Sequence, residues 1–324
     1  MMKGVVYKST GSWYLVKGED QSFYKCRMKG KFRIKGIKST NPIAVGDRVL
    51  FSSSESSSSD SKSIDYLITK IFTRDNYIVR KSVNLSKQTH IIASNIDTAF
   101  LIITLTDPPT STVFIDRFLV AASAYKINAV LIFNKMDTYD QEQKYEIEWL
   151  ISIYEKIGYE CLKVSAKEEM GLDKVWNKMQ SKTTIFSGHS GVGKSTLLNA
   201  MDPSLQIKTK EVSEQHHQGQ HTTTFAQMYD LDHGKIRIID TPGIKGFGMV
   251  DIDKLELGKY FPEFLSLQHQ CKFNNCLHTT EPHCAIKKAL DAEEISFTRY
   301  QSYLQILEGD DKEEVYRKNN YSKI

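Results

Sequence analysis

Residues 183–195 read TTIFSGHSGVGKS, an apolar strand-like run followed by a glycine-rich loop that ends in Lys194 and Ser195. The helix-like run TLLNAM follows it. A GxxxxGK[ST] loop between a strand and a helix binds phosphates, because its glycines let backbone N–H groups close around the α- and β-phosphates. Lys194 would reach the β- and γ-oxygens, and the Ser195 hydroxyl can ligate Mg²⁺. The stretch therefore predicts a nucleotide site formed by Gly188, His189, Ser190, Gly191, Val192, Gly193, Lys194, Ser195 and Thr196.

The region around this loop alternates between apolar runs and helix-like segments. The runs TAFLIITL, AVLIFNK, CLKVSAK and KIRIIDT are separated by segments such as 114–126 and 141–157. Buried strands that alternate with helices are typical of a mostly parallel α/β sheet. We therefore expect an α/β nucleotide-binding domain over residues 76–249.

Two further motifs complete the predicted phosphate and magnesium site. Asp240 ends the strand-like run KIRIID and begins DTPG, which closes at Gly243. A carboxylate at that strand end can hold Mg²⁺ through a water. The run HTTT, which contains His221 and Thr223, supplies hydroxyls where a switch loop would reach the γ-phosphate and the metal. We predict that Ser195 and Thr223 ligate Mg²⁺.

The choice of base depends on two loops that follow other strands. Asn134, Lys135, Met136 and Asp137 follow AVLIF, and Ser165, Ala166 and Lys167 follow CLKV. The Asp137 carboxylate can accept two hydrogen bonds from the N1–H and amine edge of guanine, and adenine has neither donor there. The two loops together favour GTP over ATP.

The order of these motifs is permuted. In ordinary GTPases the phosphate loop comes first, whereas here Asn134 precedes Gly188 by 188 minus 134, or 54, residues. The same sheet can still form, because the ends of a domain often lie close together and permutation at exposed loops is tolerated. We predict a circularly permuted GTPase domain.

The basic residues concentrate in the N-terminal part of the chain. Residues 1–75 hold 14 Lys+Arg and 7 Asp+Glu, a net +7, although the whole chain is only +4. Short β-rich runs over 4–71 predict a small all-β barrel, with 52–63 as a loop. Cations recur at every second position in one strand-like stretch, which favours a polyanion partner over a solvated sheet face. We predict that RNA binds Lys25, Arg27, Lys29, Lys31, Arg33 and Lys35.

A Cys/His cluster marks the C-terminal part, 250–324, where a helical tail follows. Three of the five cysteines lie within 14 residues, which suits a tetrahedral Cys₃His zinc site of structural type. His278 and His283 both compete for the fourth position. Cys26 and Cys161 lie in strand-like patterns and are expected in the core. We predict zinc ligation by Cys271, Cys276, His278 and Cys284.

Composition excludes other classes. The chain has 324 residues, 40% apolar and 25% charged, so it is neither disordered nor fibrous. No apolar run is long enough to span a membrane, and the first ten residues lack the pattern of a signal peptide. We expect a cytoplasmic protein without a membrane partner, and a monomer.

The barrel, the permuted motifs NKMD, SAK, GHSGVGKS, HTTT and DTPG, and the CxxxxCxHxxxxxC cluster together resemble the ribosome small subunit-dependent GTPase A (RsgA) family. The resemblance covers essentially the whole chain. It implies an OB fold, a permuted GTPase domain and a zinc domain. It also implies a GTPase that acts late in small-subunit maturation, binds rRNA and is stimulated by the subunit. One departure is Gln220, where the family usually has a basic residue before the switch histidine.

The residue after Gly243 is Ile244, whose side chain cannot orient an attacking water as the glutamine of Ras-like enzymes does. We therefore expect slow intrinsic hydrolysis. We predict that His221 positions the attacking water and that Lys194 and Thr223 are the other catalytic residues. The alternative for His221 is a solvated loop histidine. Two alternative functions stay open. One is a GTP-gated RNA-binding module with incidental turnover, and the other is a permuted GTPase of large-subunit assembly.

Overall fold

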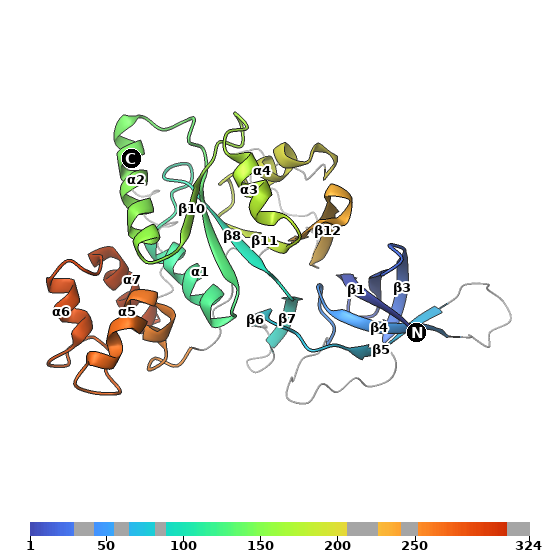
Figure 1. Ribbon diagram of the computed structural model, residues 1–324, viewed down its shortest axis with the longest axis horizontal. Helices are drawn as coiled ribbons and strands as arrows, with labels where there is room; N and C mark the ends of the chain where they lie inside the picture. Colours follow the sequence, from blue (N-terminus) through green and yellow to red (C-terminus); the bar gives the residue numbers. More distant parts are fainter. Residues whose placement is uncertain (29–41, 55–64, 82–88, 206–225, 241–251, 310–324) are drawn as a thin grey trace, which may run out of the picture. The chain divides into compact units, whose positions relative to one another are not determined.

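The computed structural model describes residues 1–28, 42–54, 65–81, 89–205, 226–240 and 252–309 (Figure 1). The chain forms two compact units. The first contains residues 1–109 and 121–250, and the second contains residues 110–120 and 251–324. None of the helices in the described ranges combines the length and the apolar character that a membrane crossing needs. The predicted domain bounds 1–75, 76–249 and 250–324 stay a prediction.

The N-terminal part of the first unit is a closed five-stranded barrel. Its strands are β1 (Met2–Ser9), β2 (Tyr14–Gly18), β3 (Phe23–Met28), β4 (Arg48–Ser54) and β5 (Asp65–Ile71). They pair in the order β1-β2-β3-β5-β4, and β4 pairs back to β1, so the barrel closes; only the β3–β5 pair is parallel. Alternate residues point inward and form a core of Val6, Tyr14, Val16, Cys26, Ile43, Val49, Phe51 and Ile68.

The predicted loop over 52–63 was wrong at its start. Three serines of this stretch extend β4 and pair with β5, namely Ser52, Ser53 and Ser54. Serine is a weak strand former, but pairing with a neighbouring strand satisfies the backbone groups and overrides that preference.

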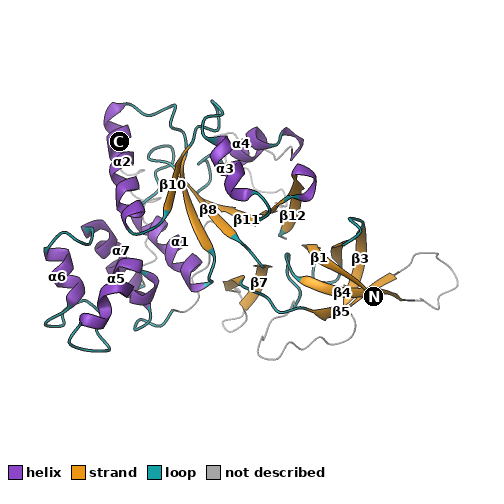
Figure 2. Ribbon diagram, viewed as in Figure 1, coloured by secondary structure: helices purple, strands orange, loops and turns teal. Residues whose placement is uncertain are grey.

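The second part of the first unit holds a hairpin and a mostly parallel sheet with helices around it (Figure 2). The hairpin joins β6 (Tyr77–Lys81) to β7 (Thr89–Ser94). The sheet order is β10-β9-β8-β11-β13-β12, in which only β12 is antiparallel to its neighbour. Its strands are β8 (Thr98–Ile103), β9 (Asn128–Phe133), β10 (Glu160–Lys163), β11 (Thr183–Ser187), β12 (Gln227–Leu231) and β13 (Ile236–Asp240).

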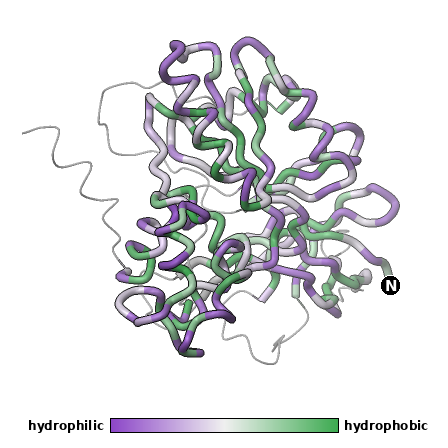
Figure 3. Tube along the Cα trace, turned by 60° about the vertical axis from the view of Figure 1, so that its left-hand side comes forward, coloured by the Kyte–Doolittle hydropathy of each residue, from purple (hydrophilic) through white to green (hydrophobic). Residues whose placement is uncertain are grey.

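The crossover helices are α1 (Thr112–Ala124), α2 (Gln141–Lys156), α3 (Leu172–Met179) and α4 (Lys194–Met201). Helices α3 and α4 share one hydrophobic core with the strands, in which Phe100, Ile132 and Leu197 are fully buried. Figure 3 shows hydrophobic stretches of the chain running through the interior of the fold. The fold-class prediction is therefore confirmed. The predicted helix over 114–126 instead covers 112–124, because Lys126 takes a positive φ of 59° and ends the helix.

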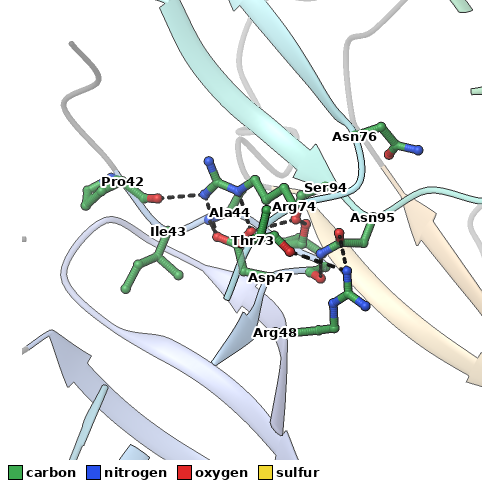
Figure 4. A network of polar contacts seen from close by, with 12 residues as sticks. Pro42, Ile43, Ala44, Asp47, Arg48, Thr73, Arg74, Asn76, Ser94 and Asn95 are labelled. Atoms are coloured by element: carbon green, nitrogen blue, oxygen red, sulfur yellow. Dashed lines mark hydrogen bonds and ion pairs between the residues drawn. The ribbon is translucent and has the colours of Figure 1, made fainter. Parts of the chain in front are cut away.

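A buried ion pair connects the barrel with the segments that lead out of it (Figure 4). Asp47, which is fully buried before β4, accepts two 2.6 Å hydrogen bonds from Arg74 in the segment after β5. It also accepts hydrogen bonds from the Ser94 hydroxyl at 2.7 Å and the Ala44 N–H at 2.8 Å. Because every partner of this carboxylate is a donor, the burial of its charge is compensated.

The second unit is built from short helices. They are η3 (Leu257–Tyr260), α5 (Pro262–Leu267), η4 (Gln268–Gln270), α6 (Ala285–Asp291) and α7 (Phe297–Glu308). The buried Arg299 of α7 pairs with Asp116 of α1 at 2.5 Å and with Glu263 of α5 at 2.7 Å. Its guanidinium also lies over the Phe261 ring. The first turns of α1 are thereby tied to the C-terminal helices. The predicted helical tail is confirmed as far as α7 extends.

Candidate nucleotide and metal sites

The glycine-rich loop lies between β11 and α4, as the sequence predicts for a phosphate-binding loop. Gly193 takes a φ of 96° directly before α4, and a Cβ there would lie 2.4 Å from the Asn134 amide nitrogen. The position therefore requires glycine for its conformation and for the space it leaves to Asn134. The loop delivers the N–H groups at the start of α4, where an anion is favoured.

Lys194 lies inside this loop. Its ammonium donates hydrogen bonds of 2.6 Å to the carbonyls of Gly188 and His189. Burial lowers the pKa of Lys194 to about 8, and the Asp240 carboxylate opposes that shift. The pKa of Asp240 is in turn raised by burial and lowered by Lys194. The strand end that carries Asp240 therefore faces the phosphate loop closely enough for the two charges to interact.

Asn134 connects three loops that follow three different strands. The side chain is almost fully buried, at 1% exposure. Its amide donates to the Val192 carbonyl at 2.8 Å, and its oxygen accepts the Ala166 N–H at 3.1 Å. One residue thus fixes the phosphate loop and both predicted base-reading loops relative to one another.

Asp137 and Ser165 form the next contact between the base-reading loops. The Ser165 hydroxyl donates to the Asp137 carboxylate at 2.5 Å and accepts the Glu168 N–H at 3.1 Å. Because this bond fixes the orientation of the carboxylate, the remaining lone pairs of Asp137 are held in a defined direction. Lys167 is exposed at the edge of this loop, and Met136 is buried behind it.

Two neighbours of this pocket escape sequence reasoning. Tyr139 is buried, donates to the Asn134 carbonyl at 3.1 Å and accepts the Leu105 N–H at 3.0 Å. The Asp107 carbonyl accepts a hydrogen bond from the Lys135 ammonium. The loop after β8 therefore helps to position the loop of Asn134 and Lys135. No motif marks either contact; the strand-end position of 104–109 is the only signal that could have suggested them.

Several predicted site residues lie outside the described part of the chain. These are His221, Thr223 and Gly243 of the phosphate and switch motifs, and Lys29, Lys31, Arg33 and Lys35 of the basic stretch. Lys25 and Arg27 are described and lie exposed on β3. Of the other phosphate-loop residues, Ser190 and Thr196 are exposed and Ser195 is half-buried at the start of α4.

The structure brings four predicted metal ligands together in the second unit. The ligand atoms of Cys271, Cys276, His278 and Cys284 all lie within 4.8 Å of one another. His278 Nδ1 is 3.4 Å from Cys284 Sγ and 3.7 Å from Cys271 Sγ. Tetrahedral ligands at zinc-like bond lengths lie about 3.4–3.8 Å apart, so the donor set fits such an ion. His283 is exposed and does not belong to the cluster.

The loop that carries His278 is held from several sides. The Glu281 carboxylate accepts the Leu277 and Thr279 N–H groups, both at 2.8 Å. The Tyr300 and Tyr303 hydroxyls donate to the carbonyls of residues 278 and 277 at 2.7 and 2.8 Å. Burial lowers the pKa of His278, which favours the neutral imidazole that binds metal. This part of the chain can therefore hold one metal ion.

The two remaining cysteines lie apart from that cluster. Cys26 is fully buried in the barrel core, and Cys161 is half-buried on β10. Burial raises the pKa of each thiol to about 12, so neither is a reactive thiolate at neutral pH. The expected core position is confirmed for Cys26, whereas Cys161 is only partly covered.

The chain is similar to known proteins over almost its whole length. The family model described as RsgA GTPase matches residues 71–250, and the RsgA N-terminal domain model matches residues 3–59. A "Small ribosomal subunit biogenesis GTPase RsgA" from Flavobacterium johnsoniae is 62% identical over 320 residues, covering 99% of this chain and 96% of the relative. The protein of that name from Christiangramia forsetii is 60% identical, covering 99% of this chain and 100% of the relative.

Solved structures give the same result. YjeQ from Thermotoga maritima superposes with a TM-score of 0.75 at 33% identity, covering 95% of this chain and 98% of that one. YloQ, described as a circularly permuted GTPase, gives a TM-score of 0.70 at 30% identity, with 95% of each chain covered.

Proposed function

This chain belongs to the RsgA family of GTPases, and from that premise we propose that it hydrolyses GTP in the biogenesis of the small ribosomal subunit. The observation that carries the proposal is that Asn134 hydrogen-bonds to the phosphate loop and to a base-reading loop, and so joins three motif loops. It is supported by 60% identity, over 99% of this chain, to a protein named for that role. We further propose that the protein acts as a cytoplasmic monomer on small-subunit rRNA, with GDP as product.

Guanine recognition is the first step of the proposed mechanism. Asp137 would accept the N1–H and amine of guanine, and the fixed Ser165–Asp137 bond supports that role, because it sets the carboxylate in one orientation. A backbone N–H of residues 165–167 would donate to guanine O6. The aliphatic part of Lys135 would lie along the guanine ring while its ammonium keeps its hydrogen bond to the Asp107 carbonyl.

Phosphate binding is the second step. The N–H groups of residues 188–196 would surround the α- and β-phosphates, and Lys194 would exchange its two loop carbonyls for the β- and γ-oxygens. The side chains of Ser195 and Thr223 would hold Mg²⁺, Asp240 would hold it through a water, and Gly243 would bind the nucleotide as part of the DTPG motif. When bound, Mg²⁺ neutralises charge on the β- and γ-phosphates.

A zinc ion is the metal we propose for the C-terminal cluster. Three thiols and one imidazole at tetrahedral spacing are the donors that zinc prefers in closed structural sites. With four protein ligands, the ion has no open position for substrate. Its role would therefore be to fix the fold of the second unit.

His221 is proposed to position the attacking water, since Ile244 cannot. Changing His221→Ala should lower the subunit-stimulated turnover on the order of 10²-fold and leave GTP affinity nearly unchanged. Steady-state phosphate release and titration of a fluorescent GTP analogue measure the two quantities. The exposed His233 of η2 (Asp232–Gly234) offers the matched control His233→Ala. Unaltered turnover in His221→Ala would remove this residue from the mechanism.

Turnover of GTP by the purified protein with Mg²⁺ tests the function itself. It is measured alone and then with isolated small or large ribosomal subunits. Strong stimulation by small subunits only is the expected result. Tight GTP binding without stimulation would favour the GTP-gated RNA-binding module, and stimulation by large subunits would favour the other alternative. The names of the relatives already favour the small subunit.

A further inference from the structure

The outward face of the β2–β3 hairpin carries cations and aromatic rings together. Tyr14, Val16 and Cys26 point into the barrel core, so their neighbours along each strand point outward. Cross-strand pairing sets Leu15 opposite Lys25 and Lys17 opposite Phe23. The outward set contains no acidic residue and consists of Trp13, Leu15, Lys17, Phe23, Lys25 and Arg27.

Trp13 is the centre of this face. The Arg27 guanidinium carbon lies 4.0 Å from the centroid of the Trp13 ring, and the Lys25 ammonium lies 4.4 Å from it. Lys17 is engaged elsewhere, because it pairs with Asp230 at 2.6 Å. Lys25 and Arg27 are exposed, and no ion pair with an acidic residue is found for either among the described residues. Their charges are therefore available to an anionic partner.

The turn before β2 holds Trp13 in place. The Thr10 N–H donates to the Trp13 carbonyl at 3.0 Å, and the Trp13 N–H donates to the Thr10 hydroxyl at 3.3 Å. Between them Gly11 takes a φ of 85°, which a residue with a Cβ rarely adopts. The Tyr14 hydroxyl donates to the Gly11 carbonyl at 3.3 Å. These bonds fix the backbone of Trp13, and the Lys25 and Arg27 side chains over its ring restrict the indole, so a partner that stacks there orders little that is not already ordered.

We propose that Trp13, together with Lys25 and Arg27, forms a stacking site for an unpaired nucleotide of RNA. The proposal rests on the proposed function, since it names what the basic barrel recognises. Indole rings and guanidinium planes stack on bases whose faces are free, whereas a duplex keeps its base faces covered. The two cations that lie over the ring match the phosphates that flank such a base. An acidic protein surface would use the two charges and leave the ring without a role.

Binding of a fluorescently labelled single-stranded oligoadenylate RNA tests this site, with duplex RNA of the same length beside it. Trp13→Leu should weaken single-strand binding about tenfold, Trp13→Phe should recover most of it, and duplex binding should stay the same. Because Trp13→Leu removes no charge, the dependence of the affinity on salt should keep its slope. Lys25→Gln should instead lower that slope by about one. Thermal unfolding of each variant confirms that the barrel stays folded.

Trp149→Leu is the matched control, because Trp149 is 50% exposed and lies on α2, which is not part of the barrel. Equal single-strand affinity in Trp13→Leu and the wild type would overturn the proposal, as would equal losses for single-stranded and duplex RNA. Failure of the wild type to bind the single strand would also overturn it. Subunit-stimulated GTP turnover of the wild type, measured in parallel, tests the proposed function separately. Stimulation without single-strand binding would reject only the stacking site.

Discussion

The nucleotide pocket and the Cys/His cluster reach a defined geometry in two different ways. In the pocket, side chains such as Asn134 and Tyr139 hydrogen-bond to backbone groups of neighbouring loops, and every loop follows a strand of one buried sheet. In the cluster, the loop between η4 and α6 carries three thiols and an imidazole whose ligand atoms converge within 4.8 Å. The pocket is held by the protein alone, whereas the cluster brings together donors that suit a metal ion.

The difference predicts where each region is vulnerable. Losing a ligand-binding group in the pocket should cost function and leave the fold intact, because the sheet beneath it is unaffected. A change that weakens the cluster should lower its metal affinity and destabilise the residues around it, because metal binding and folding are coupled in small sites of this kind.

Lys194→Ala is the change with the largest expected effect. Removing the charge that meets the β- and γ-oxygens should lower kcat/KM for GTP by about 10³-fold, with the melting temperature of the protein nearly unchanged. Steady-state turnover and thermal unfolding measure the two quantities. Lys174→Ala on α3, which removes an exposed lysine of the same unit, is the control. A large drop in melting temperature would show that the fold depends on this lysine, and would contradict the expectation that a ligand-binding group can be lost without harm to the fold.

Glu281→Gln tests the cluster in the same way. The carboxylate accepts two backbone N–H groups beside His278, and the amide has one acceptor oxygen instead of two. Zinc affinity should fall about 30-fold, as for other groups that orient metal ligands, and GTP affinity should stay the same. Competition with a chromophoric chelator measures the zinc affinity. Glu256→Gln, which breaks only a surface pair with Lys259, is the control. Equal zinc affinities for Glu281→Gln and wild type would contradict this role.

The pH dependence of GTP binding gives the smallest predicted effect. Since burial lowers the pKa of Lys194 to about 8, its charged form is lost as pH rises through that value. If GTP binds the charged form, its affinity should fall about tenfold between pH 7 and pH 9. Titration of a fluorescent GTP analogue at constant ionic strength measures the change. Constant affinity over that range would mean that the ammonium stays protonated in the free protein.

The fold class and the three cysteines of the cluster could be predicted from the sequence. Strand-then-loop patterns placed Asn134, Asp137 and Lys194 at strand ends, and cysteine spacing gave the cluster, because these signals are local. Tyr139 and Asp107 could not be found in this way, since their role depends on contacts between the loop after β8 and the loop after β9, which are 28 and 34 residues apart in the sequence. The same holds for Arg299, whose partner Asp116 lies 183 residues away. The choice of His278 over His283 also needed the geometry of the cluster.

Removing the proposed zinc ion tests the contrast between the two regions most directly. The protein is dialysed against a chelator, Mg²⁺ is restored, and GTP affinity is measured together with hydrogen exchange of residues 257–308. We expect GTP affinity within about twofold of the untreated protein, faster exchange around Cys271 and Cys284, and recovery when zinc is added back. Loss of GTP affinity together with the metal, or unchanged exchange in 257–308, would contradict this expectation.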